Sequence, residues 1–121
     1  MRRRDVGILG EKIARDFLTS NSYHILETNY RCSAGEIDVV ARHGDSLVFV
    51  EVRTKRSRQF GTPEESITPT KKERLRAALY HYLQNHDNLP ASWRIDVIAI
   101  EMDIKGKVSR IELIENAIGE G

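Results

Sequence analysis

Charged residues recur at two-residue spacing on two neighbouring apolar stretches of this chain. The first stretch carries Glu36 and Asp38, and the second carries Glu51, Arg53 and Lys55. Acidic side chains within β-branched, apolar runs cost free energy unless a partner offsets their charge. Two carboxylates about 4 Å apart at an effective dielectric near 20 repel by about 4 kcal/mol. The pattern therefore predicts a compensating cation at this place.

Either a basic side chain or a divalent metal ion could supply that positive charge. Arg53 and Lys55 share a strand face with Glu51 and could pair with it. Mg²⁺ takes oxygen ligands and is commonly held by one or two carboxylates together with a substrate phosphate. Such a metal activates water and offsets charge at phosphorus, while a nearby cation positions the nucleophile. These residues predict phosphodiester hydrolysis with Mg²⁺ or Mn²⁺ on Asp38 and Glu51, and with Arg53 or Lys55 on the phosphate.

The two stretches, residues 36–42 and 46–54, are predicted strands of one antiparallel hairpin around His43-Gly44-Asp45. We expect Gly44 and Asp45 to be the two loop residues of a II′-type turn, because Gly-Asp is a common loop pair. A loop of His43 and Gly44, or a three-residue loop with a bulge, is the alternative.

The choice of loop decides which charged side chains face one another. In the favoured register the numbers of paired residues sum to 89, so Asp38 faces Glu51 and Glu36 faces Arg53. The alternative two-residue loop places Glu36 opposite Glu51. We interpret Glu36 with Arg53 as a structural ion pair rather than as a metal-binding pair.

The other helices and strands are predicted from the periodicity of apolar residues. They are a helix over residues 5–20, a strand over 23–29, a loop over 56–68, a helix ending at Asn85, and strands over 93–101 and 108–114. Asp5 is the expected cap of the first helix, and Thr68 or Thr70 that of the second. The order α-β-β-β-α-β-β predicts one α/β domain of the α+β kind over residues 1–121, with a mixed sheet of about five strands flanked by helices.

Composition limits the partners and the location of the protein. The 121 residues carry a net charge of only +1, so overall charge favours no particular partner. A single cysteine, Cys32, can form no internal disulfide. No apolar run is long enough for a signal peptide or a membrane span, so we expect a cytoplasmic protein without membrane contact.

Basic residues gather on both sides of the predicted loop. Those we expect to bind nucleic acid beside the acidic pair are Arg56, Arg58, Lys71 and Lys72. Aromatic side chains near these segments could stack on bases, but we expect core or edge packing for Tyr30, Phe60 and Tyr80.

Several separated motifs together carry a family resemblance. They are Gly10-Glu11, Gly35-Glu36-Ile37-Asp38, Val48-Phe49-Val50-Glu51-Val52-Arg53, Phe60-Gly61-Thr62-Pro63 with Glu65, Lys71, and Arg94-Ile95-Asp96-Val97. The chain resembles the YraN family over nearly its whole length. That family is similar to the PD-(D/E)XK nucleases, especially archaeal-type Holliday junction resolvases. The resemblance implies a restriction-endonuclease-like fold, an endonuclease acting on branched or single-stranded DNA, and a homodimer.

The resemblance also implies roles for individual residues. Asp38 and Glu51 would be the first and second metal-binding acids, and the carbonyl of Val52 a third ligand. Glu11 would be the helix acid that some resolvase-like proteins direct at the metal. Arg53 stands where the superfamily has a lysine, and an arginine stays charged, so it can orient or stabilise but not accept a proton.

Because Arg53 stands in place of a lysine, other catalytic residues and other functions stay open. Lys55 could reach the site from two residues further along the strand. The chain could also be a non-catalytic nucleic-acid-binding module on the same fold, or a protein-interaction domain.

Overall fold

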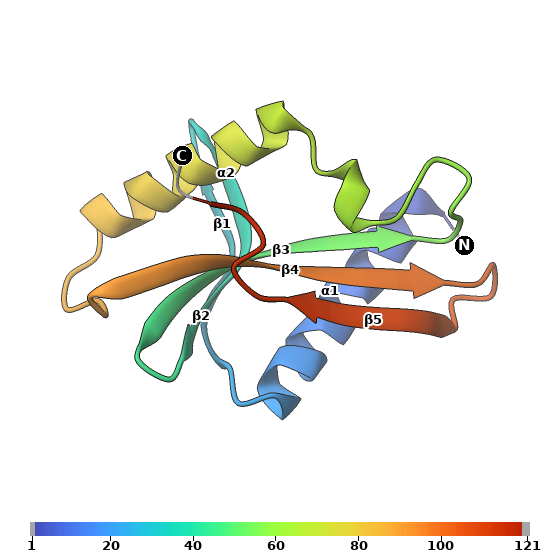
Figure 1. Ribbon diagram of the computed structural model, residues 1–121, viewed down its shortest axis with the longest axis horizontal. Helices are drawn as coiled ribbons and strands as arrows, with labels where there is room; N and C mark the ends of the chain where they lie inside the picture. Colours follow the sequence, from blue (N-terminus) through green and yellow to red (C-terminus); the bar gives the residue numbers. More distant parts are fainter. Residues whose placement is uncertain (1, 120–121) are drawn as a thin grey trace.

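The computed structural model describes residues 2–119, which form a five-stranded mixed sheet with two helices (Figure 1). The elements in chain order are α1 (Arg3–Ser20), β1 (His24–Cys32), β2 (Gly35–His43), β3 (Ser46–Lys55), the short 3₁₀ helix η1 (Glu64–Ser66), α2 (Pro69–Gln84), β4 (Ser92–Met102) and β5 (Val108–Ile114). This order confirms the predicted α+β arrangement. Within residues 2–119 the one element beyond those predicted is η1, which lies in the predicted loop.

The β2–β3 hairpin has the favoured register. His43 pairs with Ser46 and Val39 with Val50, so the paired numbers sum to 89. Gly44 has a φ of 59°, which the first loop residue of a II′ turn requires and which glycine adopts without strain. The Gly44-Asp45 turn therefore sets the alignment of the two acid-bearing strands.

Strand β3 lies at the centre of the sheet, whose order is β1-β2-β3-β4-β5. It is antiparallel to β2 and parallel to β4, from Ser46 opposite Ser92 to Lys55 opposite Glu101. Parallel neighbours need a crossover connection, and η1 and α2 provide it. The crossover brings the start of α2 back over the sheet.

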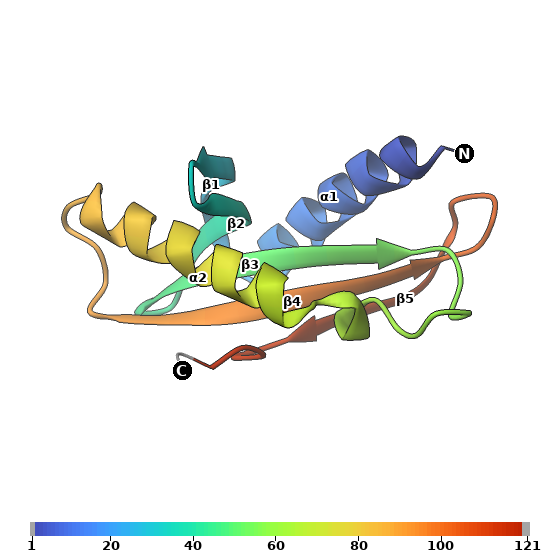
Figure 2. The same cartoon turned by 90° about the horizontal axis from the view of Figure 1, so that it is seen from above.

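The two helices cover opposite faces of the sheet (Figure 2). Phe49 and Leu79 belong to the core on the α2 side, and Val48 and Leu18 to the core on the α1 side. Covered faces explain why β3 and β4 are apolar on both sides over most of their length. The charged residues of β3 therefore stand out at its carboxyl end.

One predicted helix cap was wrong and one was confirmed. α1 begins at Arg3, after an extended Arg2, so Asp5 lies in the first turn, where its charge favours the helix dipole without capping. The Thr68 hydroxyl accepts a hydrogen bond from the Lys71 backbone N–H at 3.2 Å and caps α2.

The three aromatic side chains expected to pack in the core or at its edge differ in how they are packed. Tyr30 packs edge-on against Tyr82, with ring centroids 5.1 Å apart, and Tyr80 contacts Trp93 in the same manner. Phe60 contradicts the expected packing, because 82% of it is exposed on the loop after β3. The loop holds the Phe60 side chain outside both hydrophobic cores.

Among the helices in residues 2–119, none is both long and apolar enough to cross a membrane.

Candidate functional site

The site begins where β2 separates from β3. Pairing between the two strands ends at Val39 opposite Val50. Val39 belongs to the core on the α1 side, but Ile37, two residues earlier, belongs to the core on the α2 side. The usual alternation of side chains is therefore broken at Asp38.

Asp38 replaces the missing strand pairing with its own side chain. Its Oδ2 accepts a hydrogen bond from the backbone N–H of Val52 at 2.8 Å. The N–H and C=O of one strand residue point to the same edge, so the carbonyl of Val52 also points towards the opening between the strands. Asp38 is thus fixed against β3 at the mouth of the opening.

Glu51 lies beside Asp38, although the paired register of β2 and β3 ends one residue before them. Burial raises the pKa of the Glu51 carboxyl, and the charge of Asp38 and a hydrogen bond to it raise that pKa further, to about 9. Arg53 and Lys71 offset part of this effect. The two acids therefore form a close pair that holds a proton at neutral pH unless a cation takes its place.

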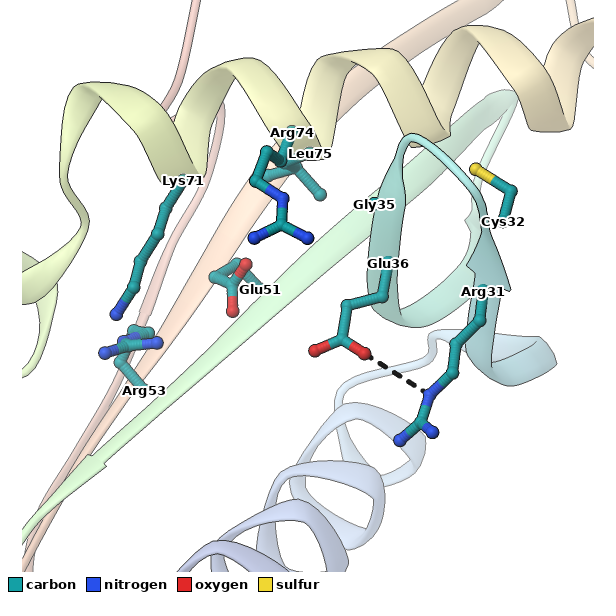
Figure 3. A pocket seen from close by; sticks show the side chains of 9 residues that line it. All are labelled: Arg31, Cys32, Gly35, Glu36, Glu51, Arg53, Lys71, Arg74 and Leu75. Carbon is teal, nitrogen blue, oxygen red and sulfur yellow. Dashed lines mark ion pairs between the residues drawn. The ribbon is translucent and has the colours of Figure 1, made fainter.

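Cations from two elements surround Glu51 in a cavity of about 290 Å³ (Figure 3). Arg53 comes from β3, and Lys71 and Arg74 from the first turns of α2. Burial lowers the pKa of Lys71, and the positive charge of Arg53 lowers it further. This crowding of positive charge is what an anionic ligand would relieve.

The expected pairing of Glu36 with Arg53 was wrong. At this point β2 pairs with β1, and Glu36 forms an ion pair with Arg31 at 3.3 Å (Figure 3). Arg53 instead donates a hydrogen bond from Nε to the Ser66 hydroxyl of η1 at 2.9 Å. The separation of β2 from β3 explains both changes.

Glu11 approaches the acidic pair from α1. Burial raises its pKa, and the charge of Asp38 raises it further. Gly10 permits this approach, because a Cβ at that position would lie 2.1 Å from Oγ1 of Thr54 on β3. The predicted helix acid therefore lies on the Asp38 side of the site.

Gly35 permits a similar approach on the other face. A Cβ there would lie 2.3 Å from the carbonyl oxygen of Arg74 in α2. The two glycines bring one helix from each side against the strands that carry the acids. Sequence reasoning missed this role, because each contact joins segments far apart in the chain.

The structure describes no group of three or more His, Cys, Asp or Glu side chains that converge as metal ligands within residues 2–119. A cation at this place would rest on Asp38 and Glu51, with the Val52 carbonyl, water or a substrate oxygen completing its ligands. That donor set suits Mg²⁺, which keeps several waters and takes few protein ligands.

The predicted nucleic-acid-binding residues do not all lie in one cavity. Arg56 and Lys71 line a second cavity of about 630 Å³, as does Lys55. Arg58 is tied to Glu101, to which it donates from both Nε and Nη2. In the described part of the chain, Lys72 lines neither of these two cavities.

Two basic residues at the cavities were missed in sequence reasoning. They are Arg3 in the second cavity and Arg31 in the first. No spacing rule could have found them, because α1 and β1 meet the acid-bearing strands only in the folded chain. Exposed basic residues are common on helices, so their types alone carry little signal.

Comparison with known proteins matches this chain to a family over most of its length. A profile of "Uncharacterised protein family UPF0102" matches residues 10–100. A UPF0102 protein of Roseiflexus castenholzii is 47% identical over 98% of this chain and 97% of its own length. One of Moorella thermoacetica is 44% identical over 97% and 98%, and one of Caldicellulosiruptor saccharolyticus is 41% identical over 97% and 99%. The chain therefore belongs to the UPF0102 family, the YraN family that its motifs predict.

Proposed function

We propose that the protein is a Mg²⁺- or Mn²⁺-dependent endonuclease acting on branched or single-stranded DNA. The observation that carries the proposal is the close pair of Asp38 and Glu51 at the opening between β2 and β3, with the pKa of Glu51 raised to about 9. A buried acid pair of this kind favours either a proton or a metal ion. The likeness of the family motifs to PD-(D/E)XK nucleases favours the metal.

Each residue would have a distinct role. Asp38, Glu51 and the Val52 carbonyl would hold the metal, with Glu11 behind Asp38. When bound, the metal would polarise the scissile phosphate and lower the pKa of the attacking water. Arg53, oriented by Ser66, would stabilise the charge that grows on the phosphate oxygens. Lys71 and Arg74 line the same cavity and would bind the neighbouring phosphate oxygens.

A second candidate function is nucleic-acid binding without cleavage. Arg53 favours it, because its guanidinium is held by Ser66 and an arginine, unlike a lysine, does not serve as a general base. Under this alternative, removal of both acids leaves binding intact, and the protein cuts no DNA in the presence of metal.

Cleavage of labelled DNA tests the proposal. The purified protein is incubated with branched and single-stranded DNA and with Mg²⁺ or Mn²⁺, beside an Asp38→Asn, Glu51→Gln double variant. We expect cutting by the wild type and a loss of at least about 100-fold in the variant, as for other essential catalytic groups. A Glu73→Gln variant, changed at an exposed position of α2, is the control. Equal cutting by the wild type and the double variant would contradict the proposal.

A further inference from the structure

The second cavity lies beside the acidic site and is strongly basic. Its cationic side chains come from α1, from the end of β3 and its following loop, and from α2, and they are Arg3, Arg53, Lys55, Arg56 and Lys71. None of the lining residues is acidic. Arg53 and Lys71 also line the first cavity, so the two cavities adjoin.

These cations are not used in ion pairs within the described chain. Among residues 2–119, no carboxylate lies within salt-bridge distance of Arg3, Lys55 or Arg56. Arg58, only two residues beyond Arg56, differs sharply because it is bound to Glu101. Like charges brought together without counter-charges repel one another, and an anionic ligand in the cavity would offset that repulsion.

Phe60 adds a flat apolar surface to this cavity. It lines the cavity and has the largest exposed fraction, 82%, among the exposed large hydrophobic side chains of the described residues. A nucleic-acid base offers a π-face that stacks on such a ring, and basic side chains around it hold the backbone. In a duplex the faces of the bases are already covered, so an exposed aromatic ring selects unpaired nucleotides.

We infer that the second cavity binds single-stranded nucleotides flanking the scissile phosphate, with Arg3, Lys55 and Arg56 on backbone phosphates and Phe60 stacked on a base. The position of the scissile phosphate in the adjoining cavity rests on the proposed function; the binding of the single strand does not. The substrate class is thus a polynucleotide that is single-stranded on one side of the cut, including the arms of an opened branch.

Binding without metal tests the inference separately from cleavage. Fluorescence anisotropy follows labelled single-stranded DNA and RNA of about 12 nucleotides, and a DNA duplex of the same sequence, in the presence of EDTA. For the preferred single strand, we expect Phe60→Ala to raise Kd by about tenfold and Phe60→Trp to leave it within about twofold. The DNA and RNA arms identify which polynucleotide the cavity prefers.

Two controls separate stacking from charge. Tyr80→Ala removes another aromatic ring, 44% exposed on α2 and packed against Trp93, and we expect no change in binding. Inorganic polyphosphate competes through charge alone, and its binding should be weakened by the Lys55→Ala, Arg56→Ala double variant but not by Phe60→Ala.

Two outcomes would overturn the inference. One is single-strand binding that Phe60→Ala leaves unchanged, and the other is a duplex that binds as tightly as the single strands. Active cleavage with either outcome would remove the single-strand subsite and keep the nuclease. Phe60-dependent single-strand binding without cleavage would keep the subsite and remove the nuclease.

Discussion

At the scale of single residues, Asp38 and Glu51 are the groups on which the site depends. Asp38 is held by the Val52 backbone, and Glu51 is held beside it with a raised pKa. The same closeness that would bind a cation opposes ionisation of the pair when no cation is present. Stability and metal binding must therefore both depend on pH.

The first prediction concerns stability without metal. Because the pKa of Glu51 is raised in the folded state, its contribution to stability is complete below its unfolded pKa and is lost as pH rises towards 9. Urea denaturation in EDTA should show the free energy of unfolding falling by at least about 1.4 kcal/mol between pH values of about 5 and 9. Glu51→Gln should flatten this fall, because its amide does not ionise.

The control for this prediction is Glu73→Gln, the same change at an exposed position. It should leave the wild-type fall in place. An equally steep fall in Glu51→Gln would contradict the assigned cause.

The residues of the site were only partly predictable from the sequence. The Gly44-Asp45 turn predicted the register of the hairpin up to Val39 opposite Val50, next to Asp38 and Glu51, because turn chemistry is local. The partner of Glu36 was missed, because a strand can leave its neighbour without any local signal. The packing expected of Phe60 was wrong, because an exposed aromatic and a buried one have the same residue type.

At the scale of elements, two close contacts bring the helices onto the sheet. Gly10 sets α1 against Thr54 of β3, and Gly35 sets β2 against the backbone of α2. Element order, type and approximate length followed from periodicity, since hydrophobic repeats reflect burial. The close approaches at Gly10 and Gly35 could not be predicted from periodicity, because they depend on which faces of the helices and the sheet meet.

The second prediction compares two glycines of α1. Gly10→Ala should lower the free energy of unfolding by about 1–3 kcal/mol, because the added methyl group overlaps Thr54. Gly7→Ala should raise it by up to about 1 kcal/mol, because nothing lies within 4 Å of the added methyl and alanine favours helix. Chemical denaturation measures both. Equal effects of the two changes would show that α1 does not pack closely at Gly10.

The third prediction concerns the tie between β5 and η1. Arg110 donates to both carboxylate oxygens of Glu64, at 3.0 and 2.8 Å, and lowers the pKa of Glu64 to about 2. Arg110→Gln should reduce stability by about 1–3 kcal/mol at neutral pH. Because the pKa of Glu64 is lowered, the stabilisation is present above its unfolded pKa and is lost as pH falls towards 2.

Chemical denaturation at pH values of about 7 and 2 measures the free energy of unfolding of both proteins. The difference in this free energy between the wild type and Arg110→Gln should be smaller at the acidic pH. Arg42→Gln, at an exposed position of β2, is the control and should cost little at either pH. A gap that does not change with pH would contradict a role for the Glu64 charge.

At the scale of the whole molecule, the arrangement of charge matters more than its sum. The net charge is +1, yet five cations line one cavity without a lining acid. Acidic residues that do not line the cavity, such as Glu101 with Arg58 and Glu64 with Arg110, balance the total in ion pairs of their own. This separation of charge could not be predicted from the order of residues, because it appears only when α1, β3 and α2 meet.

The fourth prediction follows from that separation. Binding of single-stranded DNA should weaken with salt, with a slope of log Kobs against log salt of about −0.7 for each phosphate contacted. Replacing Lys55 and Arg56 with alanine should make the slope shallower by about 1.4, since two contacts are lost. Arg42→Ala, at the far end of the β2–β3 hairpin, should leave the slope unchanged. Equal slopes for the wild type and the double variant would place the contacts elsewhere.

A titration with Mn²⁺ tests the central claim most directly, because it asks whether Asp38 and Glu51 hold a metal. Electron paramagnetic resonance of free Mn²⁺ should show saturable binding of about one ion to the wild type. Binding should tighten as pH rises, because the ion displaces the Glu51 proton. The Asp38→Asn, Glu51→Gln double variant should lose this binding and Glu73→Gln should keep it. Equal binding by the double variant and the wild type, or no saturable binding by the wild type, would contradict the account.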